Sequence, residues 1–364
     1  MNISVSGRFL RVNNPTGTQR SATRLLTATL RAARAGEFEL FIPRGAEERA
    51  GEIAAGASAI FRRMPSPNGK ADHLWEQLLW PAMSRARTLL SLMGTGPILH
   101  PGHRHIMVVH DINFMLLPQV FTPAFRVWYR YACGQAARRA DAIICFSAYV
   151  KRSLINRLGI VPERIHVIYQ GPGIDVETLR NSEMPAPRRP YFLCVGSLQP
   201  HKNLKTILAA WARLNQEIPD FELKIVGRRQ SRFSVCDFAH ELAEARNVTF
   251  TGYINDTELA SAYKGATAFI YPSLEEGFGL PIVEAFYSGC PVITSNCSCL
   301  PEIAGDAAWQ VNPQSVEELV EAMRKLANSP SAREKLITRG LSRAGLFSWP
   351  AAGAQLAEKL NIWH

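Results

Sequence analysis

Paired cysteines are missing from this sequence. Its 364 residues include seven cysteines, an odd number, and the nearest two, Cys297 and Cys299, are separated by one residue. Zinc ribbons and redox-active motifs use a CxxC spacing, which does not occur here. We therefore expect neither, and we expect reduced thiols, as in a cytoplasmic protein.

Long apolar runs are missing as well. No run approaches the roughly 18 residues that a membrane-spanning helix needs. The first residues, MNISVSGRFLRVNN, lack the apolar core and cleavage site of a secretory signal, so none is expected. A hydrophobic content of 47% and a charged content of 20% fit a folded globular chain. At roughly 100–200 residues per domain, the length predicts two domains.

Acidic residues are scarce in the first half. Residues 1–187 hold 23 Lys and Arg against 13 Asp and Glu, whereas residues 188–364 hold 18 of each, so the net charge of +10 arises in the first half. Unless it serves solubility alone, this asymmetry predicts an anionic partner, such as a phosphate-bearing substrate or the inner face of the plasma membrane. The arginines are scattered and no nucleic-acid reader motif occurs, so nucleic acid is not expected.

Short β-type runs alternate with helical runs along the whole chain. This alternation predicts the α/β class, with two doubly wound Rossmann-like domains built on parallel sheets and facing a cleft. Proline-rich residues 183–190 predict the linker. The domains are then 1–186 and 187–345, and a last helix in 346–364 is expected to pack back on the first domain. The predicted strands are 39–44, 97–102, 105–111, 141–147, 191–197, 221–227, 248–254, 268–273, 291–295 and 307–313. The predicted helices are 20–36, 203–216, 258–266, 281–289, 316–328 and 347–360.

Two segments of the first half leave alternatives open. WEQLLWPAMSRARTLLSL, residues 75–92, reads as a helix that lies on a membrane surface or is buried with an arginine edge. Arginines in residues 124–140 would extend the same patch. HPGHRHIMVVHD, residues 100–111, holds four histidines and an aspartate. A zinc site is the alternative there, but no closed ligand pattern such as HExxH occurs, so no metal is predicted.

The segment EEGFGLPIVEAF, residues 275–286, follows the end of a predicted strand. Ligands of open parallel sheets bind at the carboxyl ends of the strands. Gly277 and Gly279 let the backbone turn tightly and approach a ligand. Pro281 suits the first position of a helix, where its missing N–H costs nothing. The segment is therefore predicted to be a ligand-binding loop followed by a helix start.

This helix start predicts an anion site between two carboxylates. The amides of Phe278, Gly279 and Leu280 would point outward from a helix start, which carries partial positive charge and binds phosphate. Glu276 and Glu284 can each accept hydrogen bonds from paired hydroxyls. A diphosphate with a polyol on either side describes a nucleotide-sugar. Ordinary loop and helix-cap carboxylates are the alternative.

The wider run SLEEGFGLPIVEAFYSGCPVITSNCSCLPEIAG resembles the donor-site signature of the retaining glycosyltransferases of family four, which have the GT-B fold. VGSLQPHKN is similar to the family segment in which a lysine, here Lys202, binds the donor diphosphate. Many members have an arginine where this chain has Ser197. The resemblance therefore leaves one cationic contact open, which His201 or Arg228 could supply.

Three further stretches are similar to the same family. VTFTGYIND resembles the segment that holds the nucleobase through backbone groups, near Tyr253 and Ile254. NPTGTQR resembles the flexible loop over the donor phosphates, with Gly17 and Thr18. VVHDINF resembles the strand and loop that place His110 beside the transferred sugar.

The resemblance implies a chemistry as well as a site. His110, Glu276 and Lys202 would be the catalytic residues, with Glu284 on the ribose, and Ser147 would cap a helix of the first domain. No metal cofactor is implied, because the DxD triplet of the other major glycosyltransferase fold is missing. The implied reaction is same-face transfer, with a donor phosphate oxygen taking the acceptor proton.

Within these segments, the HKN of residues 201–203 and the HD of residues 110–111 resemble the versions found in bacterial mannosyltransferases of surface-polysaccharide assembly. They imply transfer of mannose from GDP-mannose to a lipid-linked oligosaccharide, in O-antigen or similar synthesis. A UDP- or dTDP-sugar donor, a sugar-nucleotide epimerase on the same fold and a non-enzymatic carbohydrate binder are the alternatives.

Overall fold

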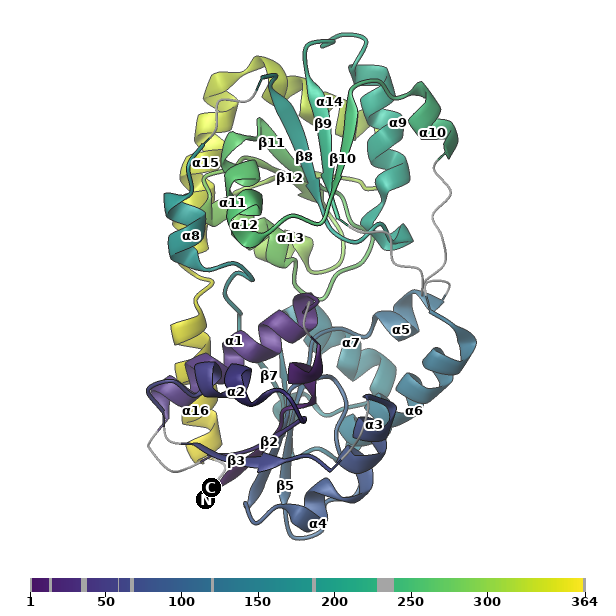
Figure 1. Cartoon of the computed structure of the whole chain (residues 1–364). Coiled ribbons are helices and arrows are strands. Elements are labelled where there is room, and N and C mark those ends of the chain that lie inside the picture. Colours follow the sequence, from purple (N-terminus) through teal and green to yellow (C-terminus); the bar gives the residue numbers. More distant parts are fainter. Residues whose placement is uncertain are drawn as a thin grey trace. The chain divides into compact units, whose positions relative to one another are not determined.

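The chain folds into two α/β units, each built on one parallel sheet (Figure 1). The computed structural model describes residues 2–12, 15–33, 38–57, 59–65, 69–118, 121–184, 188–227 and 239–362. Helices lie on both faces of each sheet, which is the doubly wound arrangement (Figure 1). The α/β class and the two Rossmann-like domains predicted from the sequence are confirmed.

The first unit comprises Met1–Ile112, Ala124–Gly173 and Ser348–His364. Its strand order is β3-β2-β1-β4-β5-β6-β7, and the inner strands are almost wholly buried, whereas the edge strands β3 and β7 are partly exposed. The strands are β1 (Ile3–Ser6), β2 (Phe38–Ile42), β3 (Ala59–Arg63), β4 (Thr88–Ser91), β5 (Arg104–Val109), β6 (Ala142–Cys145) and β7 (Ile165–Val167). The helices are η1 (Arg8–Arg11), α1 (Gly17–Ala32), α2 (Glu47–Ile53), α3 (Gly69–Leu78), α4 (Trp80–Met83), α6 (Pro123–Arg139), α7 (Ala148–Leu158), η3 (Pro162–Arg164) and α16 (Trp349–Ile362).

The second unit comprises Asn113–Pro123 and Ile174–Phe347. Its strand order is β10-β9-β8-β11-β12-β13. The strands are β8 (Tyr191–Val195), β9 (Glu222–Val226), β10 (Val248–Gly252), β11 (Ala268–Tyr271), β12 (Val292–Ser295) and β13 (Trp309–Val311). The helices are α5 (Asn113–Leu116), α8 (Val176–Asn181), η4 (Pro200–Lys202), α9 (Leu204–Leu214), α10 (Ala239–Glu244), α11 (Asp256–Gly265), α12 (Leu280–Tyr287), α13 (Leu300–Ala304), α14 (Val316–Asn328) and α15 (Pro330–Ala344).

Two predicted elements of the first unit were wrong. Residues 97–102 contain no strand, and residues 75–92 are not one helix. That segment divides into the end of α3, the short helix α4 and the strand β4. Pro81 lies in the first turn of α4, where it needs no hydrogen-bonded N–H. Strand β4 is buried throughout because it lies between β1 and β5, and that burial is invisible in its short sequence.

The second unit begins before the predicted boundary at residue 187. Helix α8 packs against α11 and α12, so it belongs to the second sheet's helical layer. Lys264 of α11 donates hydrogen bonds to the backbone carbonyls of Arg180 and Ser182, and the Arg180 guanidinium lies 5.4 Å from the ring centroid of Tyr287. The polar character of residues 176–182 did not reveal these contacts.

Helix α16 at the end of the chain packs along α1 in the first unit (Figure 1). Gly353 makes this close approach possible, because a Cβ there would lie 2.3 Å from the backbone carbon of Ala28. The indole N–H of Trp349 donates to the carbonyl of Pro172 at 2.7 Å. The two contacts fix α16 at its start and along its length.

Replacing Gly353 tests this packing. We expect Gly353→Val to destabilise the protein by about 2 kcal/mol or more, because the new side chain must displace the backbone of α1. The matched control is Ala354→Val, one residue away on the exposed side of α16, which should cost roughly 0.5 kcal/mol from helix propensity alone. Denaturant unfolding measures both, and equal effects would show that the helix contact contributes little.

Candidate functional site

Two predicted side chains, Lys202 and Glu276, meet at the carboxyl edge of the second sheet. Tyr271, which the sequence did not single out, joins them. The Lys202 ammonium lies 2.5 Å from Glu276 Oε1 and 2.9 Å from the Tyr271 hydroxyl. Tyr271 in turn donates to Glu276 Oε1 at 2.7 Å. Lys202 ends η4 after β8, Tyr271 ends β11, and Glu276 lies in the loop after β11. The ends of two adjacent strands therefore supply one hydrogen-bonded set.

Backbone contacts between the loops hold this set in place. The Leu274 amide donates to the carbonyl of His201 at 2.8 Å. The side-chain amide of Asn203 donates to the carbonyls of Pro272 and Pro313, at 3.1 and 2.7 Å. These bonds join the loops that follow β8, β11 and β13, so the site is positioned by three strand ends rather than by one flexible loop.

Glu276 is held as a carboxylate. Burial acts to raise the pKa of Glu276, but the adjacent Lys202 charge and the hydrogen bonds from Lys202 and Tyr271 outweigh it and keep the pKa below its ordinary value. Burial and the nearby carboxylate raise the pKa of Tyr271 well above its ordinary value. Near neutral pH, Tyr271 therefore keeps its proton and Glu276 is an acceptor.

His201 is one of the two residues that the sequence left open for a further contact with the diphosphate, and that role stays a prediction. Burial, followed by the neighbouring Lys202 charge, lowers the pKa of His201 to about 4. The ring is neutral near pH 7, so it offers a hydrogen bond rather than a charge. Arg228, the other candidate, lies outside the described residues.

The helix start predicted near Phe278 is present. Helix α12 begins at Leu280, with Gly279 as its N-cap. Gly279 has a φ of 95°, a conformation that favours glycine, whereas Gly277 has no positive φ. Pro281 lies in the first turn, one position later than predicted. The Phe278 side chain is buried and packs edge-to-face on Phe347 at 5.7 Å.

Glu284 lies one turn into α12 and is buried. Its Oε2 accepts a hydrogen bond from the Tyr263 hydroxyl of α11 at 3.1 Å. Glu276 precedes α12 and Glu284 lies inside it, and their role on either side of an anion stays a prediction.

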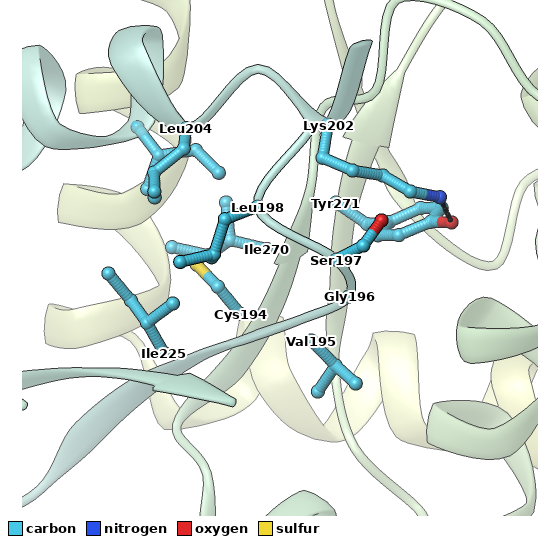
Figure 2. A pocket seen from close by; sticks show the side chains of 11 residues that line it. Cys194, Val195, Gly196, Ser197, Leu198, Lys202, Leu204, Ile225, Ile270 and Tyr271 are labelled. Carbon is cyan, nitrogen blue, oxygen red and sulfur yellow. Dashed lines mark hydrogen bonds between the residues drawn. The ribbon is translucent and has the colours of Figure 1, made fainter. Parts of the chain in front are cut away.

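A pocket lies beside this set at the ends of β8, β9 and β11. Figure 2 shows Ser197, Lys202 and Tyr271 on one side of it and aliphatic side chains such as Leu198, Leu204 and Ile225 on the other. The predicted residues Tyr253 and Ile254 follow the end of β10, and the Tyr253 side chain is half exposed. The described residues predicted for the second domain thus follow the carboxyl ends of strands in one sheet.

In the first unit, His110 follows β5 directly. Its Nε2 donates to the carbonyl of Leu92 at 2.8 Å, and its ring lies 5.1 Å from that of Phe146. Burial lowers the pKa of His110 to about 4, partly offset by the bond to Leu92. The ring is therefore neutral near pH 7, with Nδ1 as its acceptor nitrogen.

Gly17 and Thr18 are helical rather than part of a loop. They form the first turn of α1, and Gln19 Oε1 accepts from the backbone amide of Thr16 at 2.8 Å. The predicted cap of α7 is present, since the Ser147 side chain accepts from the amide of Val150. The site roles of Gly17 and Thr18 stay predictions.

A buried ionic cluster near His110 was missed in the sequence. Arg8, which follows β1, pairs with Glu76 of α3 at 3.2 Å and donates to Thr95 at 2.6 Å. Arg8 also donates to the carbonyl of Met93 at 3.4 Å. It therefore holds the loop after β4, whose Leu92 carbonyl accepts from His110. Only the position of Arg8 just after a strand could have drawn attention to it, and that strand, β1, was not predicted from the sequence.

Two histidines of the run before His110, His103 and His105, make contacts inside the first unit. His105 Nε2 is 2.9 Å from the Ser91 hydroxyl, and both ring nitrogens of His103 lie near backbone carbonyls, those of Ala86 and Pro81. Burial and the nearby His100 lower the pKa of His105 to about 3. Among the described residues, no group of three His, Cys, Asp or Glu side chains could hold a metal ion.

Comparison with family models gives two consecutive matches. The model described as Glycosyl transferases group 1 matches residues 175–343, and the model described as Glycosyltransferase Family 4 matches residues 16–178. Together they run through both units.

Two relatives and one solved structure illustrate the similarity. The chain is 29% identical to O-antigen chain mannosyltransferase B of Escherichia coli, over 69% of this chain and 68% of that protein. It is 31% identical to MMP alpha-(1->4)-mannosyltransferase of Mycolicibacterium hassiacum, over 64% of this chain but only 57% of that relative's length. The structure of HepE from Anabaena in complex with UDP-glucose aligns over 100% of both chains, with a TM-score of 0.74 and 18% identity. This likeness confirms the predicted GT-B fold.

The buried histidines predict a stability that depends on pH. The pKa of folded His105, about 3, lies below the ordinary value of 6.5. The unfolded chain therefore binds more protons between these values, and stability is present above pH 6.5 and lost as the pH falls. We expect His105→Gln, which keeps a donor for Ser91, to weaken this loss by about 1.4 kcal/mol per pH unit.

Denaturant unfolding between pH 7 and pH 4.5 measures the effect. His240→Gln is the control, because the side chain of His240 is 82% exposed, and it should leave the pH dependence unchanged. An unaltered slope in His105→Gln would contradict the assignment.

Proposed function

This chain belongs to the glycosyltransferases that the group 1 and family 4 models describe, and we propose that it transfers mannose from GDP-mannose, with retention, to a hydroxyl of a lipid-linked oligosaccharide. The mannosyltransferase names of both relatives support the sugar. The O-antigen name of one supports a role in surface-polysaccharide synthesis. None of the six described cysteines forms a disulfide, which agrees with the reduced thiols that the sequence predicted.

The hydrogen-bonded set of Lys202, Tyr271 and Glu276 carries the proposal. It places a cation and an ionised carboxylate together at the strand ends, beside the start of α12. A diphosphate would draw on the Lys202 charge and on the helix start. The Glu276 carboxylate would then lose its contact with Lys202 and accept hydrogen bonds from hydroxyls of the transferred sugar. Glu284 would accept hydrogen bonds from the ribose hydroxyls.

The proposed chemistry needs few groups. The bond between the anomeric carbon and the diphosphate oxygen breaks, and Lys202 stabilises the charge that develops on the departing diphosphate, which is commonly a large catalytic contribution. A bond from the acceptor oxygen forms on the same face of the sugar. The acceptor proton passes to a phosphate oxygen of the leaving group. No metal is assigned a role, and the place of neutral His110 beside the sugar is a prediction from the family resemblance.

Nucleotide binding tests the donor. We expect GDP to raise the melting temperature more than UDP or dTDP, because stabilisation follows RT ln(1 + [L]/Kd) and reaches about 2.7 kcal/mol at a hundredfold excess over Kd. Lys202→Met should abolish the shift. A larger shift with UDP or dTDP would replace GDP-mannose with one of those donors, and a shift that persists in Lys202→Met would contradict the site.

Substitution of Glu276 tests its catalytic role. Glu276→Gln keeps the size of the side chain but removes its charge, so we expect kcat/KM to fall by about 100-fold or more while GDP binding is retained. Glu275→Gln, a neighbouring carboxylate with no predicted sugar contact, is the control. Product analysis in the same assay separates an epimerase, which would form a new nucleotide-sugar without any acceptor. Full activity in Glu276→Gln would overturn the assignment.

A further inference from the structure

The hydroxyl of Tyr271 contacts both charges of the site. It accepts a hydrogen bond from Lys202 Nζ at 2.9 Å and donates one to Glu276 Oε1 at 2.7 Å. Figure 2 shows the first of these bonds, with Tyr271 and Lys202 on the same side of the pocket. The proposed function gives Lys202 a diphosphate and Glu276 a sugar, and it leaves the tyrosine without a role.

The sheet holds Tyr271 firmly. The residue ends β11 in register with Thr294 of β12, and its carbonyl accepts a hydrogen bond from the Thr294 hydroxyl at 2.9 Å. Its ring stacks on that of Phe269 with the centroids 5.4 Å apart, and only 3% of the residue is exposed. Lys202 instead ends the short 3-10 helix η4, and its ammonium stands on a flexible stem. The hydroxyl is therefore the fixed point of the set, and the ammonium is the part that can turn.

Binding of a donor would change the surroundings of Glu276. A diphosphate would draw the Lys202 ammonium away from the carboxylate, because phosphate oxygens bind cations strongly. The buried carboxylate would then lose its cation, which is unfavourable unless other hydrogen bonds remain. The bond from Tyr271 can remain, because it comes from the sheet. Lys202 and Tyr271 both bond to Oε1, so neither uses Oε2 of the carboxylate.

The other titratable groups that face Glu276 add no charge near neutral pH. They are His201, next to Lys202, and Cys299, at the start of α13. The pKa of His201 is lowered to about 4, chiefly by burial, so its ring is neutral. Burial, followed by the nearby carboxylates, raises the pKa of Cys299 well above its ordinary value, so the thiol keeps its proton. Once Lys202 has turned away, the bond from Tyr271 is left to stabilise the carboxylate.

From these contacts we propose that Tyr271 is a positioning residue for recognition of the transferred sugar. Its hydroxyl keeps the Glu276 carboxylate in place for the sugar hydroxyls while Lys202 binds the diphosphate. Tyr271 acts through Glu276 and not by contact with the reacting atoms. This role rests on the proposed function, because it requires a ligand that separates the two charges. A core tyrosine whose hydroxyl serves stability alone is the alternative.

Removal of the hydroxyl tests the proposal. We expect Tyr271→Phe to weaken binding of GDP-mannose about tenfold, because a hydrogen bond to a charged group is lost. Binding of GDP, which offers Glu276 no sugar, should change by less than about threefold. Isothermal titration calorimetry on the full chain measures both. If UDP gives the larger thermal shift, UDP-glucose and UDP take the places of GDP-mannose and GDP.

The matched control is Tyr191→Phe. Tyr191 begins β8, the strand next to β11, and is also 3% exposed. Its hydroxyl donates to the carbonyl of Ala262 at 2.8 Å. Both substitutions remove one buried hydroxyl from the same sheet, so they should lower the denaturation midpoint by similar amounts. Tyr191→Phe should bind GDP-mannose like the unaltered protein.

A double variant separates positioning from a purely structural role. In a Glu276→Ala background, Tyr271→Phe should have no further effect on GDP-mannose binding, because the carboxylate through which it acts is missing. A structural role would instead give additive losses.

The pH dependence of binding is the second such measurement. Burial acts to raise the pKa of Glu276, while the Lys202 charge and the hydrogen bonds from Lys202 and Tyr271 keep it below its ordinary value. Without the tyrosine hydroxyl this pKa rises, and the carboxylate begins to take up a proton as the pH falls. Between about pH 7.5 and pH 5.5, GDP-mannose binding by Tyr271→Phe should weaken roughly threefold more than binding by the unaltered protein.

Three outcomes would overturn the proposal. The first is GDP-mannose binding in Tyr271→Phe that equals that of the unaltered protein. The second is an equal loss of GDP and GDP-mannose binding, and the third is additivity in the double variant. These outcomes are distinct from failure of the proposed function, which a GDP-induced thermal shift that persists in Lys202→Met would show.

Discussion

The ion pair between Lys202 and Glu276 is the interaction on which the account of this protein depends. It joins the loops after β8 and β11, and each side chain is largely removed from water, with one fifth and about one tenth of its surface exposed. Removing one partner would leave the other charge buried and uncompensated. Tyr271 and the backbone bonds of Leu274 and Asn203 support the pair. A ligand that carries both a diphosphate and hydroxyls could satisfy both charges at once.

The fold of the second unit was readable because its local signals agree with its packing. Helix α14 has a serine cap at Ser315, a strong apolar stripe and a basic last turn, and its bounds were predicted to the residue. The first unit was harder. Strand β4 has only four residues, Thr88–Ser91, after an apolar, arginine-containing run that resembles a helix. What makes it a strand is its place between β1 and β5, and a single sequence does not contain that information.

The residues of the site also divide into those that the sequence revealed and those that only the structure shows. Glu276, Glu284 and Lys202 stand in recognisable motifs, so they could be named from the sequence. Tyr271 ends an apolar strand and reads as a core residue, although its hydroxyl completes the ion pair. The Arg8–Glu76 pair joins residues 68 positions apart, and no local pattern links them.

The most direct test is a crystal structure of the chain with GDP-mannose. We expect Lys202 Nζ within hydrogen-bond distance of a diphosphate oxygen, the diphosphate against the start of α12, and Glu276 on hydroxyls of the sugar. We expect the ligand to replace the 2.5 Å contact between Lys202 and Glu276, or both side chains to bind the ligand in addition to each other. A nucleotide bound elsewhere, with that contact intact, would contradict this expectation.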